Sequence, residues 1–244
     1  MTESAVSGNE DQGKENNRKL VALDVDGTLV DHDGVMSDAV RQAARDVVDA
    51  GHEVIIATGR SLGALLPVVE QIGMRRGYGV CSNGGVSVRL DPELPGGFEV
   101  VAKETFSPRS VLTALRGRLP GALYALEDAG GRFLSTESFQ DRSFGIEAIS
   151  VDFERLLRTQ AVRVVVHSAD IPVTEFEMAV AAIGLHGVTY SVGWTSWLDI
   201  AAAGVTKASA LEGLRARLGV DPANTVAVGD GGNDIEMLTW AARG

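Results

Sequence analysis

The sequence predicts an α/β protein: a doubly wound (Rossmann-like) parallel-sheet core with an inserted α+β cap domain. Three observations lead to this prediction. At both ends of the chain, short apolar runs that finish in polar residues alternate with amphipathic helical segments, as in β-α-β units. In the middle, helical segments are mixed with strands and a hairpin signal. The length, 244 residues with 45% hydrophobic positions, suffices for two small domains.

The first part of the chain has the pattern of a parallel sheet. The run LVALDVD over 20–26 is apolar and ends in carboxylates, which is typical of a buried strand that carries polar groups at its C-terminal end. Ser37 is the N-cap that we expect for the first helix, and Pro67 kinks the second helix or ends its first turn. The expected elements are a strand over 20–26, a helix over 37–51, a strand over 54–57, a helix over 61–73 and a strand over 79–82.

The middle part changes character. Gly130 and Gly131 lie between two short strand-like stretches, which is a hairpin signal. Helices mixed with hairpins indicate an α+β layer with an antiparallel sheet. The expected elements are strands over 98–104, 122–127, 132–135, 161–167 and 187–192, and helices over 108–119 and 173–183.

The α/β pattern resumes near the end of the chain. The expected elements there are a strand over 198–201, a helix over 206–218 closed by Gly219, a strand over 225–228 and a helix over 233–242. We therefore expect a disordered polar tail over 1–18, a core formed by 19–85 and 193–244, and a cap over 86–192.

Composition excludes several classes of function. Lys and Arg number 22 against 33 Asp and Glu, a net charge of −11 without a basic stripe, which argues against nucleic acid or an anionic membrane as partner. An anionic small molecule remains compatible, because a bound cation reverses the local field. No apolar run reaches the ~18 residues of a membrane span. Cys81 is the only cysteine, so a disulfide framework is impossible. The N-terminal stretch lacks an apolar signal core, and we expect a cytoplasmic protein.

Several polar residues follow predicted parallel strands, where open α/β sheets bind their ligands. Asp24 and Asp26 follow the first strand, Thr58 the second and Asp230 a later one, while Lys207 begins a helix. Carboxylates gathered in this way repel one another without a counter-charge. Mg²⁺ suits such a cluster, since it takes oxygen ligands and keeps positions open for phosphate and water. The pattern predicts a Mg²⁺ site.

These segments carry a family resemblance. The sequence resembles the haloacid dehalogenase superfamily of phosphotransferases, whose four motifs occur here in the family's order. The segment 82–85 (SNGG) and the large insertion also resemble the Cof-type sugar-phosphatase branch with its α/β cap. The four motifs are LDVDGTL over 23–29, IIATGR over 55–60, Lys207 within GVTKA over 204–208, and GDGGND over 229–234.

The resemblance implies a role for each matching residue. Asp24 is then the nucleophile that forms an aspartyl-phosphate, and it needs no activating base because its carboxylate is ionised at pH 7. Asp26 protonates the leaving alkoxide and later deprotonates the attacking water. Thr58 and Lys207 bind the transferring phosphoryl oxygens.

The resemblance also implies the metal ligands. Mg²⁺ is expected between Asp24, Asp26 (through its backbone carbonyl), Asp230 and the phosphate, with Asp234 as a supporting residue or occasional ligand. Asn233 is expected to hold the phosphate or to orient Asp230.

Three further residues are candidates for substrate binding. Gly59 and Asn83 lie in segments that the resemblance places near the substrate. Arg60 either reaches the substrate or pairs with a carboxylate of the core.

The resemblance implies a Mg²⁺-dependent phosphatase, a phosphoric monoester hydrolase, that acts on a small phosphorylated metabolite, in particular a sugar phosphate. A cap of roughly 100 residues is expected to close over a small ligand and to exclude polymers. Two alternatives stay open: a phosphosugar mutase with the same core, and a non-catalytic protein that binds a phosphometabolite. Relatives continue with a further strand and helix beyond the fourth-motif helix, so we expect an exposed flank of the core. A homodimer would cover that flank, a monomer would leave it open, and a shortened chain would also explain it.

Overall fold

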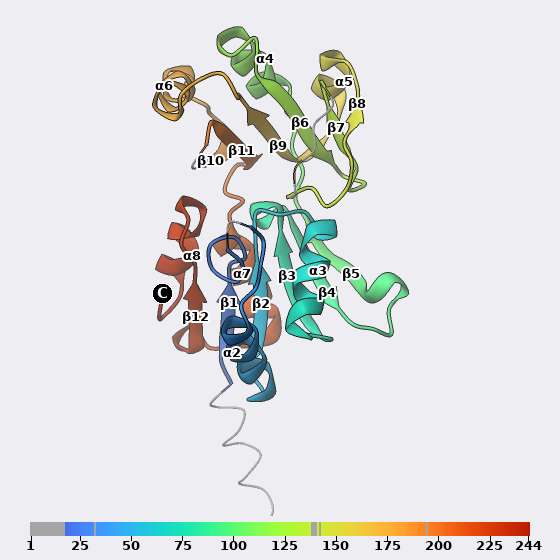
Figure 1. Cartoon of the computed structure of the whole chain (residues 1–244), viewed down its shortest axis with the longest axis vertical. Coiled ribbons are helices and arrows are strands. Elements are labelled where there is room, and N and C mark those ends of the chain that lie inside the picture. Colours follow the sequence, from blue (N-terminus) through green and yellow to red (C-terminus); the bar gives the residue numbers. More distant parts are fainter. Residues whose placement is uncertain (1–17, 32, 138–140, 142, 194) are drawn as a thin grey trace, which may run out of the picture.

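The structure, a computed structural model, describes residues 18–31, 33–137, 141, 143–193 and 195–244. Its strands form two six-stranded sheets, one in the lower and one in the upper half of Figure 1. We call the first sheet and its helices, residues 18–103 and 207–244, the core, and the second sheet and its helices, residues 106–202, the cap. The tail expected over 1–18 lies, apart from Arg18, outside the described residues.

The core sheet confirms the predicted α/β class. Its strand order is β12-β1-β2-β3-β4-β5, and β12, β1, β2 and β3 run parallel to one another. The last two strands, β4 and β5, are antiparallel to their neighbours. The bounds are Leu20–Leu23 for β1, Glu53–Ala57 for β2, Gly77–Cys81 for β3, Val86–Leu90 for β4, Phe98–Lys103 for β5 and Thr225–Val228 for β12.

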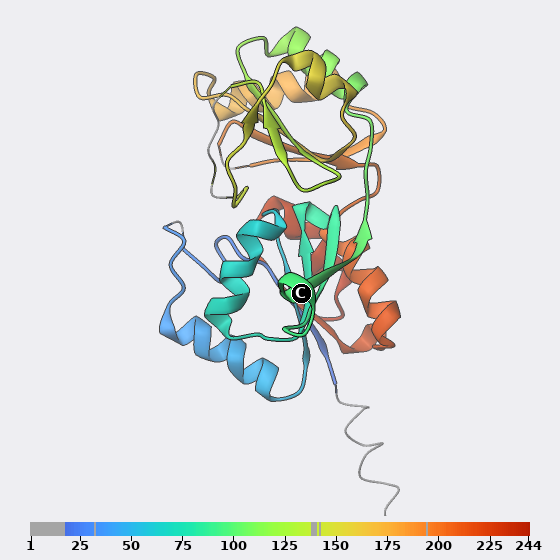
Figure 2. The ribbon, with the colours of Figure 1, turned by 90° about the vertical axis from the view of Figure 1, so that its right-hand side faces the viewer.

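Helices cover both faces of this sheet (Figure 2). On one side α2 (Asp38–Asp49) and α3 (Leu62–Ile72) pack against it, and on the other α7 (Lys207–Leu218) and α8 (Ile235–Trp240). Because side chains alternate along a strand, β1 sends Val21 and Leu23 to the first layer and Leu20 and Ala22 to the second. This two-sided burial explains why the strand is apolar throughout.

Local signals in the sequence act as expected at most helix ends. The Ser37 side chain accepts the Val40 N–H at the start of α2, and Gly219 ends α7 in the left-handed conformation. Pro67 does not end the first turn of its helix: α3 continues to Ile72, since its side chains Leu65 and Val68 are buried in the core.

The cap sheet has the order β10-β11-β9-β6-β7-β8 and is antiparallel except between β7 and β8. Three helices cover its outer face, so that its other face is turned toward the core (Figures 1 and 2). The bounds are Leu123–Asp128 for β6, Phe133–Ser135 for β7, Ile149–Ser150 for β8, Ala161–His167 for β9, Val188–Val192 for β10, Trp197–Ala202 for β11, Arg109–Arg118 for α4, Phe153–Arg158 for α5 and Val173–Ile183 for α6.

The boundaries between core and cap, as set by sheet membership, differ from the expected positions 86 and 193. Strands β4 and β5 belong to the core sheet, because β4 folds back against β3 directly after the turn at 82–85. Strand β11 belongs to the cap sheet, because it pairs with β9 and β10. The apolar runs in these strands look alike whichever sheet they join, and only their hydrogen-bonded neighbours decide. Strands β4 and β8 and helix α5 were not predicted.

Two chain segments, 104–105 and 203–206, connect the core and the cap (Figure 1). Among the described residues, no helix is both long enough and apolar enough to cross a membrane.

Candidate active site

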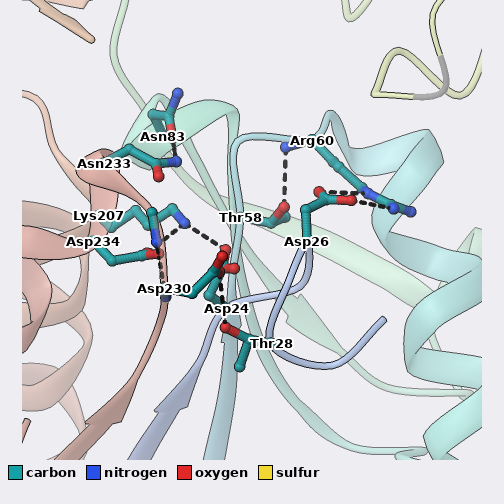
Figure 3. Close-up of polar contacts among 11 residues, drawn as sticks. Asp24, Asp26, Thr28, Thr58, Arg60, Asn83, Lys207, Asp230, Asn233 and Asp234 are labelled. Carbon is teal, nitrogen blue, oxygen red and sulfur yellow. Dashed lines mark hydrogen bonds and ion pairs between the residues drawn. The ribbon is translucent and has the colours of Figure 1, made fainter. Parts of the chain in front are cut away.

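Asp24 sits where β1 ends, between two neighbouring parallel strands. Its backbone N–H donates to the carbonyl of Val228 at 3.0 Å, which extends the pairing of β1 with β12 by one residue. The residue is only 4% exposed. Its carboxylate Oδ1 accepts a hydrogen bond of 2.6 Å from Nζ of Lys207 (Figure 3). A buried carboxylate is therefore held at the C-terminal edge of the sheet, where the sequence places it.

Lys207 is buried, at 1% exposure, and joins two carboxylates. It is the first residue of α7, which begins with a capping box between Thr206 and Ser209. Besides Asp24, its Nζ donates to Oδ1 of Asp234 at 2.7 Å. Because a buried ammonium without partners is strongly unfavourable, the two carboxylates account for its position.

Asp230 and Asp234 come from the loop after β12. Asp234 is fully buried, and its Oδ2 accepts the backbone N–H groups of Gly231 (3.0 Å) and Asp230 (3.2 Å). The exposed Asp230 accepts a hydrogen bond of 3.2 Å from Oγ1 of Thr28. Gly27 has φ +87°, and a Cβ at this position would overlap the Asp230 carboxylate. The first and fourth motifs are therefore in direct contact.

The carboxylates of Asp24, Asp230 and Asp234 converge: one oxygen from each lies within 4.8 Å of the others. Three carboxylates outweigh the single charge of Lys207, so the group has an excess of negative charge. Oxygen ligands and excess negative charge are what Mg²⁺ requires, and these residues fit the predicted ion.

Asp26 does not join this group of carboxylates. Its side chain binds Arg60 through two hydrogen bonds, Nε to Oδ2 at 2.9 Å and Nη2 to Oδ1 at 2.5 Å. The sharp turn at Gly27, whose N–H donates to the carbonyl of Val30 at 2.8 Å, directs Asp26 away from Asp24 (Figure 3). Of the two alternatives for Arg60, the structure has the pairing with a carboxylate. The expected metal contact through the Asp26 carbonyl stays a prediction.

Burial raises the pKa of Asp24 to about 6, and the nearby Lys207 ammonium limits that rise. The expectation of an ionised Asp24 at pH 7 still holds, because this pKa lies below 7.

The second motif borders the same region. Thr58 is buried at the end of β2, and its Oγ1 accepts the Arg60 N–H at 3.1 Å. A Cβ at Gly59 would lie 3.2 Å from Oδ1 of Asn83, so the glycine allows this side chain to approach closely. Asn83 in turn accepts a hydrogen bond of 2.9 Å from Nδ2 of Asn233, although the two are 150 positions apart. The structure thus joins two predicted substrate-binding residues directly.

A pocket that is open to solvent adjoins these residues between the core and the cap. The core contributes Asn83, Lys207 and Asn233 to its lining, and the cap contributes Arg163 and Asp199, among others. The carboxylates of the proposed metal site lie beside this lining rather than in it.

Sequence reasoning did not single out Arg163 and Glu127 of the cap. Arg163 donates from Nε to Oδ1 of Asp199 at 2.5 Å, and the buried Glu127 accepts a hydrogen bond of 2.5 Å from Oγ of Ser82 in the core. One signal was available: Arg163 is a lone charged residue in the apolar run AVRVVV over 161–166. Such a residue in a buried strand needs a partner or a ligand.

The chain is similar to known proteins over most of its length. Residues 21–244 match the family described as haloacid dehalogenase-like hydrolase. A phosphoglycolate phosphatase from Methanoculleus marisnigri is 27% identical over 232 residues, which cover 93% of this chain and 82% of the relative. A 5-amino-6-(5-phospho-D-ribitylamino)uracil phosphatase from Bacillus subtilis is 25% identical over 232 residues, with the same coverage of 93% and 82%.

Solved structures share the fold. A haloacid dehalogenase-like hydrolase from B. subtilis superposes with a TM-score of 0.73 at 21% identity, covering 92% of this chain and 87% of that chain. A subclass IIB sugar phosphatase of the same superfamily superposes with a TM-score of 0.73 at 22% identity, covering 92% and 85%. At these identities the likeness concerns the fold.

Proposed function

Because this chain belongs to the haloacid dehalogenase-like hydrolase family and is a phosphoric monoester hydrolase of its Cof-type branch, we propose that it cleaves a small phosphorylated metabolite, a sugar phosphate, in a Mg²⁺-dependent reaction. The observation that carries the proposal is the buried Asp24, held by Lys207 beside the carboxylates of Asp230 and Asp234. We also propose that the protein is cytoplasmic and that it acts as a monomer or a homodimer.

In the first step, an oxygen of Asp24 attacks phosphorus, and the bond between phosphorus and the alkoxide oxygen breaks. Asp26 gives its proton to the leaving alkoxide, which departs as an alcohol. In the second step, water attacks the aspartyl-phosphate, Asp26 takes the water proton, and inorganic phosphate and free Asp24 are released. For both transfers, the Asp26 carboxylate must turn from Arg60 toward the substrate, and its side chain is 59% exposed.

The surrounding residues hold the reacting groups in place. Lys207 fixes one oxygen of Asp24, and its charge opposes the repulsion between this carboxylate and a phosphate. Asp24, Asp230 and Asp234 would hold Mg²⁺, which supplies positive charge to the phosphoryl oxygens when bound. In this proposal Thr58 and the Asn83–Asn233 pair bind the phosphoryl oxygens, because their side chains lie around Asp24 and Lys207 (Figure 3).

The proposal is tested by hydrolysis of an aryl phosphate and of a hexose phosphate with and without EDTA. Asp24→Asn should lower kcat/KM at least about 1,000-fold, because it removes the nucleophile. Asp49→Asn, an exposed aspartate at the end of α2, is the matched control and should leave the rate unchanged. Full activity in Asp24→Asn, or in wild type with EDTA, would contradict the nucleophile or the metal assignment.

The products distinguish the proposed hydrolase from its alternatives. A phosphatase releases inorganic phosphate from the hexose phosphate, whereas a mutase returns the isomeric hexose phosphate. Saturable binding without turnover across a broad panel would instead favour a non-catalytic binding protein.

A further inference from the structure

Arg163 is a buried cation on the face of the cap that is turned toward the core. It lies on β9, which pairs with β11 on one side and β6 on the other. Val164 and Val166 of the same strand pack beneath the cap helices, so the alternation of the strand directs Arg163 to the opposite face. Its side chain is 3% exposed and belongs to the lining of the pocket described above.

Only part of the Arg163 guanidinium has a hydrogen-bond partner among the described residues. Its Nε donates to Oδ1 of Asp199 at 2.5 Å, and Oδ2 of Asp199 accepts a hydrogen bond of 2.9 Å from Nε1 of Trp197. The Phe144 ring lies 5.8 Å from the guanidinium carbon. By contrast, Nη1 is buried and has no hydrogen-bond partner among the residues that the structure describes. A fixed donor is thus left without an acceptor.

A buried donor without an acceptor is unfavourable, and none of the described residues supplies one to Nη1, so we consider an acceptor on a bound ligand. The pocket connects Arg163 with the proposed reaction site, because Lys207, which binds Asp24, also lines it. A substrate whose phosphoryl group lies at Asp24 therefore places its organic part toward Arg163.

The charges near Arg163 indicate which kind of acceptor fits. Asp199, at 2.5 Å, already balances the guanidinium, and the buried Glu127 is close enough for its charge to interact with it. A second anionic group on the substrate would add excess negative charge beside a guanidinium that is buried and already balanced. A neutral oxygen accepts the Nη1 hydrogen bond without that penalty. Thr189 and Ser191 on β10 add further hydroxyl groups to the same pocket.

We propose that Arg163 is a specificity-determining residue whose Nη1 binds a neutral hydroxyl or carbonyl oxygen on the leaving group, and that Asp199 disfavours substrates with a second anionic group there. This assignment rests on the proposed phosphatase function. A protein with this arrangement should hydrolyse phosphorylated sugars or polyols with a higher kcat/KM than bisphosphates and phosphorylated carboxylic acids.

The test compares kcat and KM of wild type and Arg163→Met on four substrates: an aryl phosphate, a hexose 6-phosphate, a hexose bisphosphate and phosphoglycolate. Wild type should prefer the hexose 6-phosphate. Arg163→Met should lose about 10- to 100-fold more kcat/KM on that substrate than on the aryl phosphate, through loss of one hydrogen bond to a charged donor. Arg158→Met, at an exposed arginine on α5, is the matched control and should behave as wild type.

A second variant covers the case in which Arg163→Met does not fold. Asp199→Asn keeps an acceptor for Trp197 but removes the charge that balances Arg163. It should raise kcat/KM for the bisphosphate or phosphoglycolate relative to the hexose 6-phosphate, which a merely structural role of the pair would not do.

Three results would overturn the proposal. Equal losses on all four substrates in Arg163→Met would assign Arg163 to structure alone. A wild-type preference for the bisphosphate or phosphoglycolate that disappears in Arg163→Met would show an anion site instead. No hydrolysis of any substrate by wild type, aryl phosphate included, would overturn the phosphatase proposal itself, and this assignment with it.

Discussion

At the scale of single residues, burial and the neighbouring Lys207 act in opposite directions on the pKa of Asp24. Removal from water makes the charged form of Asp24 less favourable, and the Lys207 ammonium at 2.6 Å makes it more favourable. The balance leaves the pKa of Asp24 at about 6, above its ordinary value of 3.8. The proposed nucleophile is therefore ionised at neutral pH but close enough to its pKa for mild acid to protonate it.

This pKa predicts an acid limb in the rate. The value of kcat/KM should fall as pH drops through about 6, because protonated Asp24 cannot attack phosphorus. Bound Mg²⁺ favours the ionised carboxylate, so the limb should move to lower pH at higher Mg²⁺ concentration. Measurements of kcat/KM between pH 4.5 and 8 at two Mg²⁺ concentrations would check this. If the pH at which kcat/KM falls does not change with Mg²⁺ concentration, Asp24 is not a ligand of the metal.

The same pKa affects the stability of the metal-free protein. Between about pH 4 and 6, folded Asp24 keeps a proton that the unfolded chain has released. The retained proton favours the folded state and so adds to the free energy of unfolding. This stabilisation is fully present below about pH 4 and is lost as pH rises through 6.

At the scale of elements, one cap loop docks on the start of α3. Ser61 donates its N–H to the carbonyl of Ser143 at 2.8 Å and its hydroxyl to the carbonyl of Phe144 at 2.5 Å. Gly145 has φ +67°, and a Cβ there would overlap the backbone of Gly63 and Ala64. Because Arg60 immediately precedes this contact, the loop couples the cap to the arginine that holds Asp26.

Two glycine substitutions in the cap distinguish the effect of backbone strain from the effect of losing the contact between the loop at Gly145 and α3. Gly131 also has positive φ (+78°), but nothing lies within 4 Å of its Cβ position. Gly131→Ala should lower the free energy of unfolding by about 1 kcal/mol and leave kcat/KM unchanged. Gly145→Ala should cost more and also reduce kcat/KM, because the loop can no longer sit on α3. Urea unfolding and kinetics on both variants check this, and identical results would refute a role of the loop in docking.

At the scale of the whole molecule, the face of the cap sheet opposite its helices lies over the C-terminal edge of the core sheet (Figures 1 and 2). The hydrogen bond from Ser82 to Glu127 joins the two where β3 ends. Nearby, a Cβ at Gly85 would lie 2.7 Å from a methyl group of Val162, so core and cap approach closely here. The proposed reaction site therefore lies between two layers rather than on an open surface.

This enclosure predicts a limit on substrate size. A phosphoserine peptide should be hydrolysed with a kcat/KM at least about 100-fold below that of a hexose 6-phosphate, because its flanking residues collide with the cap and displace the phosphoryl group. Phosphate release from both substrates under the same conditions is the measurement. Comparable rates would mean that the cap does not restrict access.

Much of the fold and of the candidate active site could be predicted from the sequence. The apolar run before Asp24 and the motif at Asp230 identify parallel strands, and parallel strands present their C-terminal residues at one edge. The meeting of Asp24, Lys207, Asp230 and Asp234 therefore follows from local pattern together with the family resemblance. Residues 86–103 were expected in the cap and residues 197–202 in the core, which the topology of the sheets reverses, since an apolar segment carries no mark of the strands that it pairs with.

The sequence by itself determined most of the segments that form helices and strands and which polar residues reach the edge of the core sheet, because these properties depend on local periodicity and on residues adjacent along the chain. Only the tertiary structure decided that Asp26 pairs with Arg60, 34 positions away, and Arg163 with Asp199, 36 positions away. Such pairs form when separate strands and turns are packed together, and their charges then fix which partner each side chain takes.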